Sequence, residues 1–120
     1  MSLGADQYGM KQYVIAFLKT GPNPSKDSTE RMEMQKAHMT NINKMAEAGV
    51  LVLAGPFIDG GDLRGIYLFD VKTIEEAEQW TSTDPAVQAG VFKMELHKWY
   101  GSAAILKVNE WHEKIAKIKI

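Results

Sequence analysis

An unbroken apolar run near the start of the chain, residues 13–18, constrains the fold most. It reads Tyr-Val-Ile-Ala-Phe-Leu and lies between Lys11 and Lys19. A half-exposed strand alternates apolar and polar residues, whereas a continuous run of this length is typical of a strand buried on both faces. We therefore expect a strand from Lys11 to Lys19 that needs a covering layer on each side. A second apolar run, residues 50–57, predicts another strand of the same kind.

Two capped helices are predicted after these strands. Asp27 and Glu30 stand at the spacing of a capping box, which predicts that a long helix begins there. Gly49 is placed where a left-handed residue is needed to end that helix. Thr73 and Glu76 repeat the capping-box spacing, so a second and shorter helix is predicted to begin at that point.

The remaining segments complete a β-α-β-β-α-β order. Residues 59–62 form a Gly- and Asp-rich turn that leads into a third strand over 63–71, and a fourth strand is predicted over 92–100. This is the ferredoxin-like arrangement, an α+β fold in which two helices cover one face of an antiparallel sheet. Because the first two strands are apolar on both faces, we expect a second copy of the sheet to cover the other face in a homodimer.

Residues 1–10 and 101–120 extend beyond the predicted domain, which spans residues 11–100. The first ten residues lack a hydrophobic signal region and are interpreted as a polar leader. The last twenty predict an added C-terminal helix with an apolar stripe, which has to be buried on its own subunit or on a partner. The stripe consists of Val108, Trp111, Ile115 and Ile118.

Composition excludes several classes of function. A chain of 120 residues has the length of one domain, and its formal net charge of −1, with lysines spread along it, does not predict nucleic-acid binding. The absence of cysteine excludes disulfides and thiolate catalysis. No apolar run approaches the roughly 20 residues of a membrane span. We expect a cytoplasmic protein, or an exported one if a signal peptide has been removed.

One histidine, His38, lies on the apolar stripe of the long predicted helix. It recurs at helical spacing with Met34, Ile42 and Met45, so the imidazole is expected to face inward. Two interpretations stay open. An imidazole titrates near neutral pH and can serve as a general acid and base in a pocket. Alternatively, it is a structural histidine bonded to a backbone carbonyl in the core.

Three other positions are candidates for a binding site. The chain has only two arginines, Arg31 and Arg64, and this scarcity makes each a candidate for a specific role. Arg64 either holds a substrate carboxylate through two hydrogen bonds or is a solvated residue at a sheet edge. Gly55 and Pro56 either form a pocket wall close to a ligand or simply end the second strand.

The remaining histidines do not predict a metal site. His97 and His112 share no metal-ligand spacing with His38, and no carboxylates are arranged around them. The methionines are interpreted as core and interface residues rather than as a copper motif. Because the sequence also lacks a phosphate loop and a cofactor motif, we expect neither a metal nor a cofactor.

A set of short motifs is distributed over about residues 11–100. It comprises Ala37-His38, the stretch from Ala48-Gly49 to Ala54-Gly55-Pro56, a helix ending at Trp80, and Asp84-Pro85 followed by Ala89-Gly90-Val91. Together these motifs resemble the YCII-related (YciI-like) family of small dimeric α/β barrels. The resemblance implies the ferredoxin-like fold derived above, with two sheets packed face to face across a dimer.

The resemblance also implies an active site. A histidine on the first helix and the aspartate of the Asp-Pro pair are the couple proposed for the family, and they correspond here to His38 and Asp84. Asp84 is also expected to cap a short helix that begins at Pro85, a role that uses one carboxylate oxygen and leaves the other free. The chemistry proposed for the family, by analogy with lactone isomerases and dehydrochlorinases, is acid–base work on small ring compounds. Relatives with this longer layout are often exported.

Two hypotheses about function follow. In the first, the protein is an isomerase- or lyase-type enzyme that acts without a cofactor on a small lactone, phenolic or carboxylic substrate. His38 then moves the proton and Asp84 orients it. In the second, the same dimer binds a small ligand, or assists another protein, without turnover.

Overall fold

The computed structural model describes residues 3–23 and 27–118. Two residues of the predicted leader, three residues of the predicted loop before the long helix and two residues of the C-terminal extension lie outside the described residues. The elements in chain order are β1 (Met10–Thr20), α1 (Ser28–Glu47), β2 (Leu51–Pro56), β3 (Leu63–Phe69), α2 (Ile74–Thr81), α3 (Pro85–Gln88), β4 (Phe92–Ser102), the 3₁₀ helix η1 (Ala103–Lys107) and α4 (Val108–Ile115).

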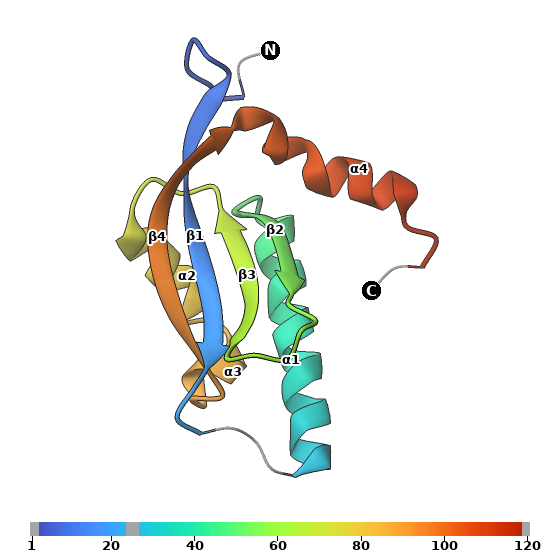
Figure 1. Cartoon of the computed structure of the whole chain (residues 1–120). Helices are drawn as coiled ribbons and strands as arrows, with labels where there is room; N and C mark the ends of the chain where they lie inside the picture. The colour runs from blue at the N-terminus through green and yellow to red at the C-terminus, as the bar shows by residue number, and fades with distance from the viewer. Residues whose placement is uncertain (1–2, 24–26, 119–120) are drawn as a thin grey trace.

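The four strands form one antiparallel sheet in the order β2-β3-β1-β4, and the predicted ferredoxin-like arrangement is confirmed (Figure 1). β1 lies inside the sheet with β3 on one side and β4 on the other. This central position explains its continuous apolar run. Val14 and Ala16 pack in the larger core under the helices, while Tyr13 and Ile15 pack in a smaller cluster on the opposite face.

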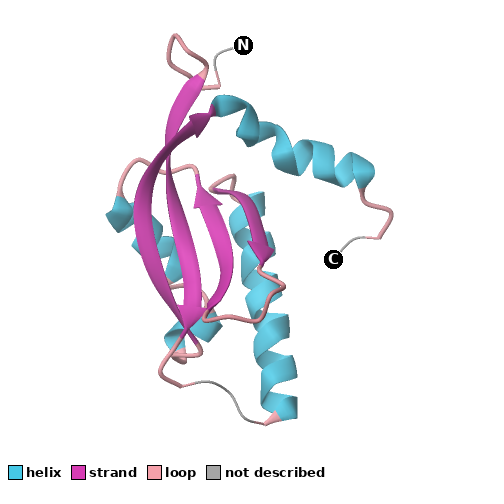
Figure 2. Ribbon diagram, viewed as in Figure 1, coloured by secondary structure: helices cyan, strands magenta, loops and turns pink. Residues whose placement is uncertain are grey.

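Helices α1, α2 and α3 lie together on one face of the sheet, behind the strands in Figure 2. Their ends follow the predicted capping chemistry. Asp27 accepts a hydrogen bond from the backbone N–H of Thr29, and Thr73 accepts one from the N–H of Glu76. Gly49 has φ +79°, the left-handed conformation in which a glycine ends a helix without strain. Within the described residues, no helix combines the length and the hydropathy needed to cross a bilayer.

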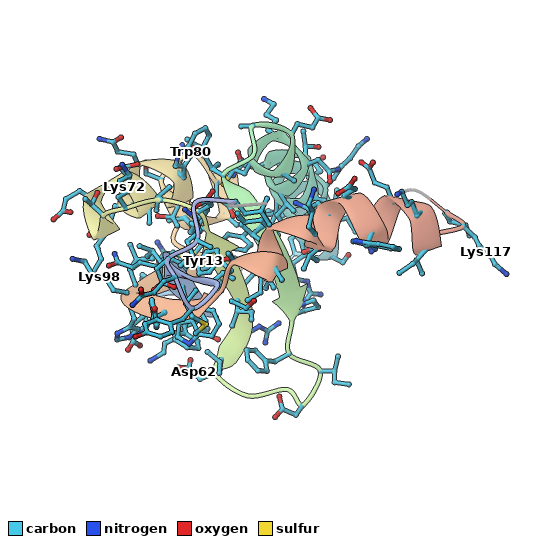
Figure 3. All side chains as sticks on the ribbon, turned by 90° about the horizontal axis from the view of Figure 1, so that it is seen from above. Tyr13, Asp62, Lys72, Trp80, Lys98 and Lys117 are labelled. Carbon is cyan, nitrogen blue, oxygen red and sulfur yellow. The ribbon has the colours of Figure 1, made fainter. Side chains whose placement is uncertain are left out.

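The opposite face of the sheet is covered only at one end. Ile105 and Leu106 of η1 pack against Tyr13 and the rest of the smaller cluster. Trp99 of β4, whose ring contacts that of Tyr13, is 41% exposed. Figure 3, a view from above, shows α1 and α2 on one side of the sheet and side chains projecting freely on the other. The described chain therefore leaves this sheet face largely open, with Trp99 exposed near the His97–Glu95 pair.

The C-terminal helix is shorter than its sequence pattern predicts. α4 ends at Ile115, so Ile118 does not extend the helical stripe. The side chain of Asn109 donates a hydrogen bond to the carbonyl of Leu51, which ties the start of α4 to the edge strand β2. Beyond that point the helix extends away from the sheet, toward the labelled Lys117 in Figure 3. Trp111 is 60% exposed, so the described subunit does not bury it.

The segment before β1 contacts the end of β4. Tyr100 donates a hydrogen bond from its hydroxyl to Asp6, and the backbone N–H of Ala103 donates to the carbonyl of Gly9 at 2.9 Å. These contacts lie across the predicted boundary between the leader and the domain. The division into residues 1–10, 11–100 and 101–120 stays a prediction.

Candidate active site

Asp84 begins the short helix α3 and is fully buried. Its Oδ1 accepts a hydrogen bond from the backbone N–H of Ala86 at 2.9 Å, and Pro85 occupies the first helical position, where a missing N–H costs nothing. The cap therefore holds the carboxylate in one orientation. The second oxygen, Oδ2, points toward α1 and β3, where its two other partners lie.

His38 and Asp84 are bonded directly, as the family resemblance implies. Nδ1 of His38 lies 2.6 Å from Oδ2 of Asp84, and the His38 residue is 7% exposed. An ionised carboxylate can only accept hydrogen bonds, so Nδ1 carries the proton in this contact. The other nitrogen, Nε2, is then the one that can take a proton from a ligand. The partner of His38 is thus a side-chain carboxylate rather than the backbone carbonyl of the structural interpretation.

Tyr67 is a third member of this group that the sequence analysis missed. Its hydroxyl donates to Oδ2 of Asp84 at 3.2 Å and lies 3.3 Å from Nε2 of His38. Strand alternation could have found it, because Tyr67 shares a face of β3 with Phe69, under the helices. A tyrosine on a core face needs a hydrogen-bond partner for its hydroxyl, and here Asp84 provides it.

The phenol of Tyr67 is held in its neutral form. Burial raises its pKa well above the usual value, and the negative charge of Asp84 and the hydrogen bond to that carboxylate raise it further. A neutral hydroxyl remains a donor, so it keeps supporting the Asp84 carboxylate throughout the physiological range. Tyr67 therefore remains a hydrogen-bond donor to Asp84 beside His38.

Tyr67 should make the protein less stable in alkaline solution. Above about pH 10 the unfolded chain releases the phenol proton while the folded chain keeps it, so the free energy of unfolding falls as pH rises. In the Tyr67→Phe variant this part of the slope disappears. Burial also raises the pKa of Tyr13, which accounts for a remaining slope. Urea unfolding between pH 8 and pH 11 measures the pH dependence of the free energy of unfolding in the wild type and in Tyr67→Phe. An unchanged slope in the variant would contradict the raised pKa of Tyr67.

A cavity of about 280 Å³ opens beside His38, between α1, β3 and the start of β4. The ring of Phe92 forms part of its wall and lies 5.3 Å from the His38 ring, centroid to centroid. This volume is near the lower end of the range for small-molecule sites. The residues that line the cavity are Thr20, Arg31, Met34, Gln35, His38, Arg64, Ala86, Val91 and Phe92.

Of the other residues predicted to bind a ligand, one lines the cavity and two do not. Arg64 lines it, at the start of β3, and so does Arg31, which the sequence singled out without assigning a role. Gly55 and Pro56 do not line it. They lie at the end of β2, opposite Ile66 and Gly65 of β3, where a Cβ on Gly55 would meet no atom. Their position fits the end of a strand, and a role in ligand binding stays a prediction for both.

The other two histidines lie away from this site. His97 is on β4, its Nε2 2.8 Å from Oε1 of Glu95, and its ring contacts Phe17 on the sheet face opposite the helices. His112 is on α4. In residues 3–23 and 27–118 no three histidine, aspartate or glutamate side chains come close enough together to hold a metal ion.

The fold and the family of the chain follow from comparison with known proteins. A solved structure with a similar fold is 5-chloro-2-hydroxyhydroquinone dehydrochlorinase (TftG) from Burkholderia phenoliruptrix AC1100, in complex with 2,5-dihydroxybenzoquinone. The TM-score is 0.55 at 18% identity, over 72% of this chain and 92% of the other. No curated protein sequence matches the chain. Residues 12–100 match the YCII-related domain, and the chain therefore belongs to the YCII-related family.

Proposed function

We propose that the protein is an enzyme that moves a proton on a small ring compound, with His38 as general acid and base and Asp84 as the residue that orients it. One observation carries this proposal: the 2.6 Å bond between His38 and Asp84 lies beside a cavity that His38 itself lines. A histidine with a purely structural role needs neither a buried carboxylate partner nor an adjoining cavity.

The proposed proton transfers follow from the tautomer of His38, in which Nδ1 carries the proton. With Nδ1–H donated to Asp84, Nε2 removes a proton from a C–H or O–H group of the substrate, and the imidazolium formed is stabilised by the carboxylate. In an isomerisation, Nε2 returns the proton to another atom of the same molecule. In an elimination, the electron pair of the broken C–H bond forms a double bond and expels a leaving group with its own electron pair. Neither reaction requires a cofactor.

The comparison with TftG adds limited support. Its name states that it removes hydrogen chloride from a chlorinated hydroquinone, which is an elimination on a small ring. At 18% identity the likeness extends to the fold alone. It indicates that a fold of this kind can accommodate acid–base chemistry, and the assignment to His38 depends on the geometry of this chain.

Hydrogen–deuterium exchange tests the proposal without knowledge of the natural substrate. A general base that removes a carbon-bound proton exchanges it with solvent, so NMR in D₂O detects the reaction in a panel of small lactones, phenols and cyclic acids. We expect the wild-type protein to accelerate exchange in at least one compound, and His38→Gln to reduce that rate by about 10²–10⁴-fold. His97→Gln, a change of the same kind at an exposed site, serves as the matched control.

The Asp84→Asn variant tests the orienting role of Asp84 separately from the proton-transfer role of His38. An asparagine amide that turns its N–H toward Nδ1 shifts the ring proton to Nε2, which can then no longer accept one. We expect ¹⁵N NMR to show this change of tautomer together with loss of exchange. Equal exchange rates in His38→Gln and the wild type would contradict the catalytic role. Ligand binding without exchange in the wild type would favour the alternative, a binding dimer without turnover.

We also propose that the protein is a homodimer that pairs through the open sheet face. The support is physical: Trp99 on that face and Trp111 and Ile115 on α4 leave large apolar side chains in water within the described chain. An apolar surface that spans a sheet face and a neighbouring helix is typical of an interface between subunits. A second copy of the same sheet has the right shape to cover it.

A further inference from the structure

The cavity beside His38 gathers the two arginines of the chain. Arg31 comes from the first turns of α1 and Arg64 from the start of β3, and both line the cavity. In the described ranges neither forms an ion pair, although the chain as a whole has a net charge of −1. No aspartate or glutamate is among the described residues that line the cavity. Two exposed arginines therefore line one cavity, and no carboxylate stands among its described lining residues.

The helix periodicity relates one of these arginines to the candidate catalytic histidine. Arg31, Met34, Gln35 and His38 stand at i, i+3, i+4 and i+7, which places them on one face of α1, and all four line the cavity. Arg31 and His38 are about 10 Å apart along the helix axis. A long arginine side chain covers part of this distance, so one small molecule can contact both residues.

The rest of the lining is mainly apolar close to His38. Phe92 packs against the imidazole, and Met34, Ala86 and Val91 complete this part of the wall. The cavity thus offers an apolar surface next to the proton-transfer group, and cations at Arg31 and Arg64. A guanidinium group binds a carboxylate through two parallel hydrogen bonds, and such charged bonds are stronger than neutral ones.

We propose that the ligand of this site is a small organic acid whose carboxylate is bound by Arg31 and Arg64. Its apolar body lies against Met34 and Phe92, with the reacting carbon near His38. This inference rests on the proposed function and narrows its substrate class from lactones, phenols and acids to carboxylates. The cavity volume of about 280 Å³ limits the ligand to a single ring or a short chain.

Pairs of acids and their amides test the proposal. Benzoate and benzamide, and cyclohexanecarboxylate and its amide, have nearly the same shape but differ in charge. Titrations followed by the NMR signals of His38 and Phe92 give their dissociation constants. We expect both acids to bind the wild-type protein in the millimolar range or tighter, and both amides to bind at least tenfold more weakly.

Arginine variants identify the groups that recognise the charge. We expect Arg31→Gln and Arg64→Gln each to weaken the binding of the acids about tenfold, and the double variant to weaken it further, with little effect on the amides. Lys36→Gln removes the same charge from the exposed surface of the same helix, outside the cavity, and should bind like the wild type. Unfolding curves for each variant verify that the fold is intact.

Three results would overturn the inference: amides that bind as tightly as acids, a double variant that retains wild-type affinity, or a wild type to which no acid of the panel binds. Its failure is distinguishable from that of the proposed function. Acids that bind through the arginines but undergo no exchange would remove the catalytic proposal alone. Rapid exchange on neutral lactones, undiminished in the double arginine variant, would remove the carboxylate proposal alone.

Discussion

Replacement of Asp84 by alanine is expected to lower the free energy of unfolding by about 3–5 kcal/mol. The side chain is fully buried and accepts hydrogen bonds from the backbone of Ala86, from His38 and from Tyr67. Its removal leaves all three donors without their partner in the protein interior and opens a small cavity. Urea unfolding at neutral pH, with the transition followed by circular dichroism, measures the loss.

A second N-cap provides the matched control. Thr73 caps α2 with its hydroxyl, which accepts from the N–H of Glu76 at 3.1 Å, and it takes no part in the group around His38. Thr73→Ala should therefore cost only the value of a cap, about 1 kcal/mol. The difference between the two variants isolates the contribution of the contacts to His38 and Tyr67. Equal losses would mean that Asp84 acts only as a cap and that the buried pair adds nothing to stability.

The sequence was sufficient for the fold because the relevant signals are local. The apolar run of β1 indicates burial on both faces, and the caps at Asp27 and Thr73 fix where two helices begin. The end of the C-terminal helix was less well determined. Ile118 continues the apolar spacing of α4 but lies beyond the last helical residue, Ile115, because spacing alone does not show where a helix loses its tertiary support.

The site was predictable only in part, since its members come from separate elements. His38 stands out as a titratable residue on an apolar stripe, but its pairing with Asp84, 46 positions away, came from the family resemblance. Tyr67 is found only from its contact with Asp84, and the proposed role of Arg31 only from its place in the lining of the cavity. The sequence pattern indicates which residues share one face of a helix or strand. It does not show how the helices and strands are placed around a cavity.

Gly55 and Pro56 illustrate a sequence pattern that is compatible with two interpretations. A glycine followed by proline after a buried strand can bring the backbone close to a ligand, and it can equally end a strand at a turn. The pairing of Gly55 with Ile66 places both residues in the last positions of the β2–β3 ladder. The local sequence is the same for both interpretations, so only the position of the two residues relative to a bound ligand can separate them.

Replacement of Trp99 by lysine is expected to convert the proposed homodimer into monomers. Trp99 is 41% exposed on the open sheet face, so the folded subunit tolerates a lysine there, whose charged end reaches water. In a face-to-face dimer, each copy would instead bury an ammonium group against the sheet face of its partner, and affinity should fall at least about a hundredfold. Light scattering after size exclusion should give twice the chain mass of 13.4 kDa for the wild type and the single-chain mass for the variant.

The control for this experiment lies on the other side of the molecule. Met32 is 73% exposed on α1, the helix that covers the opposite face of the sheet, and Met32→Lys introduces the same charge in place of an apolar side chain. This variant should remain dimeric, because the proposed interface does not include the outer side of α1. A Trp99→Lys protein that stays dimeric would exclude the sheet face as the interface, and a wild type that is monomeric at micromolar concentration would contradict the dimer itself. Because the cavity beside His38 lies under the helices, Trp99→Lys should also retain the affinity of the wild type for benzoate, so that loss of the dimer and loss of the site can be measured separately.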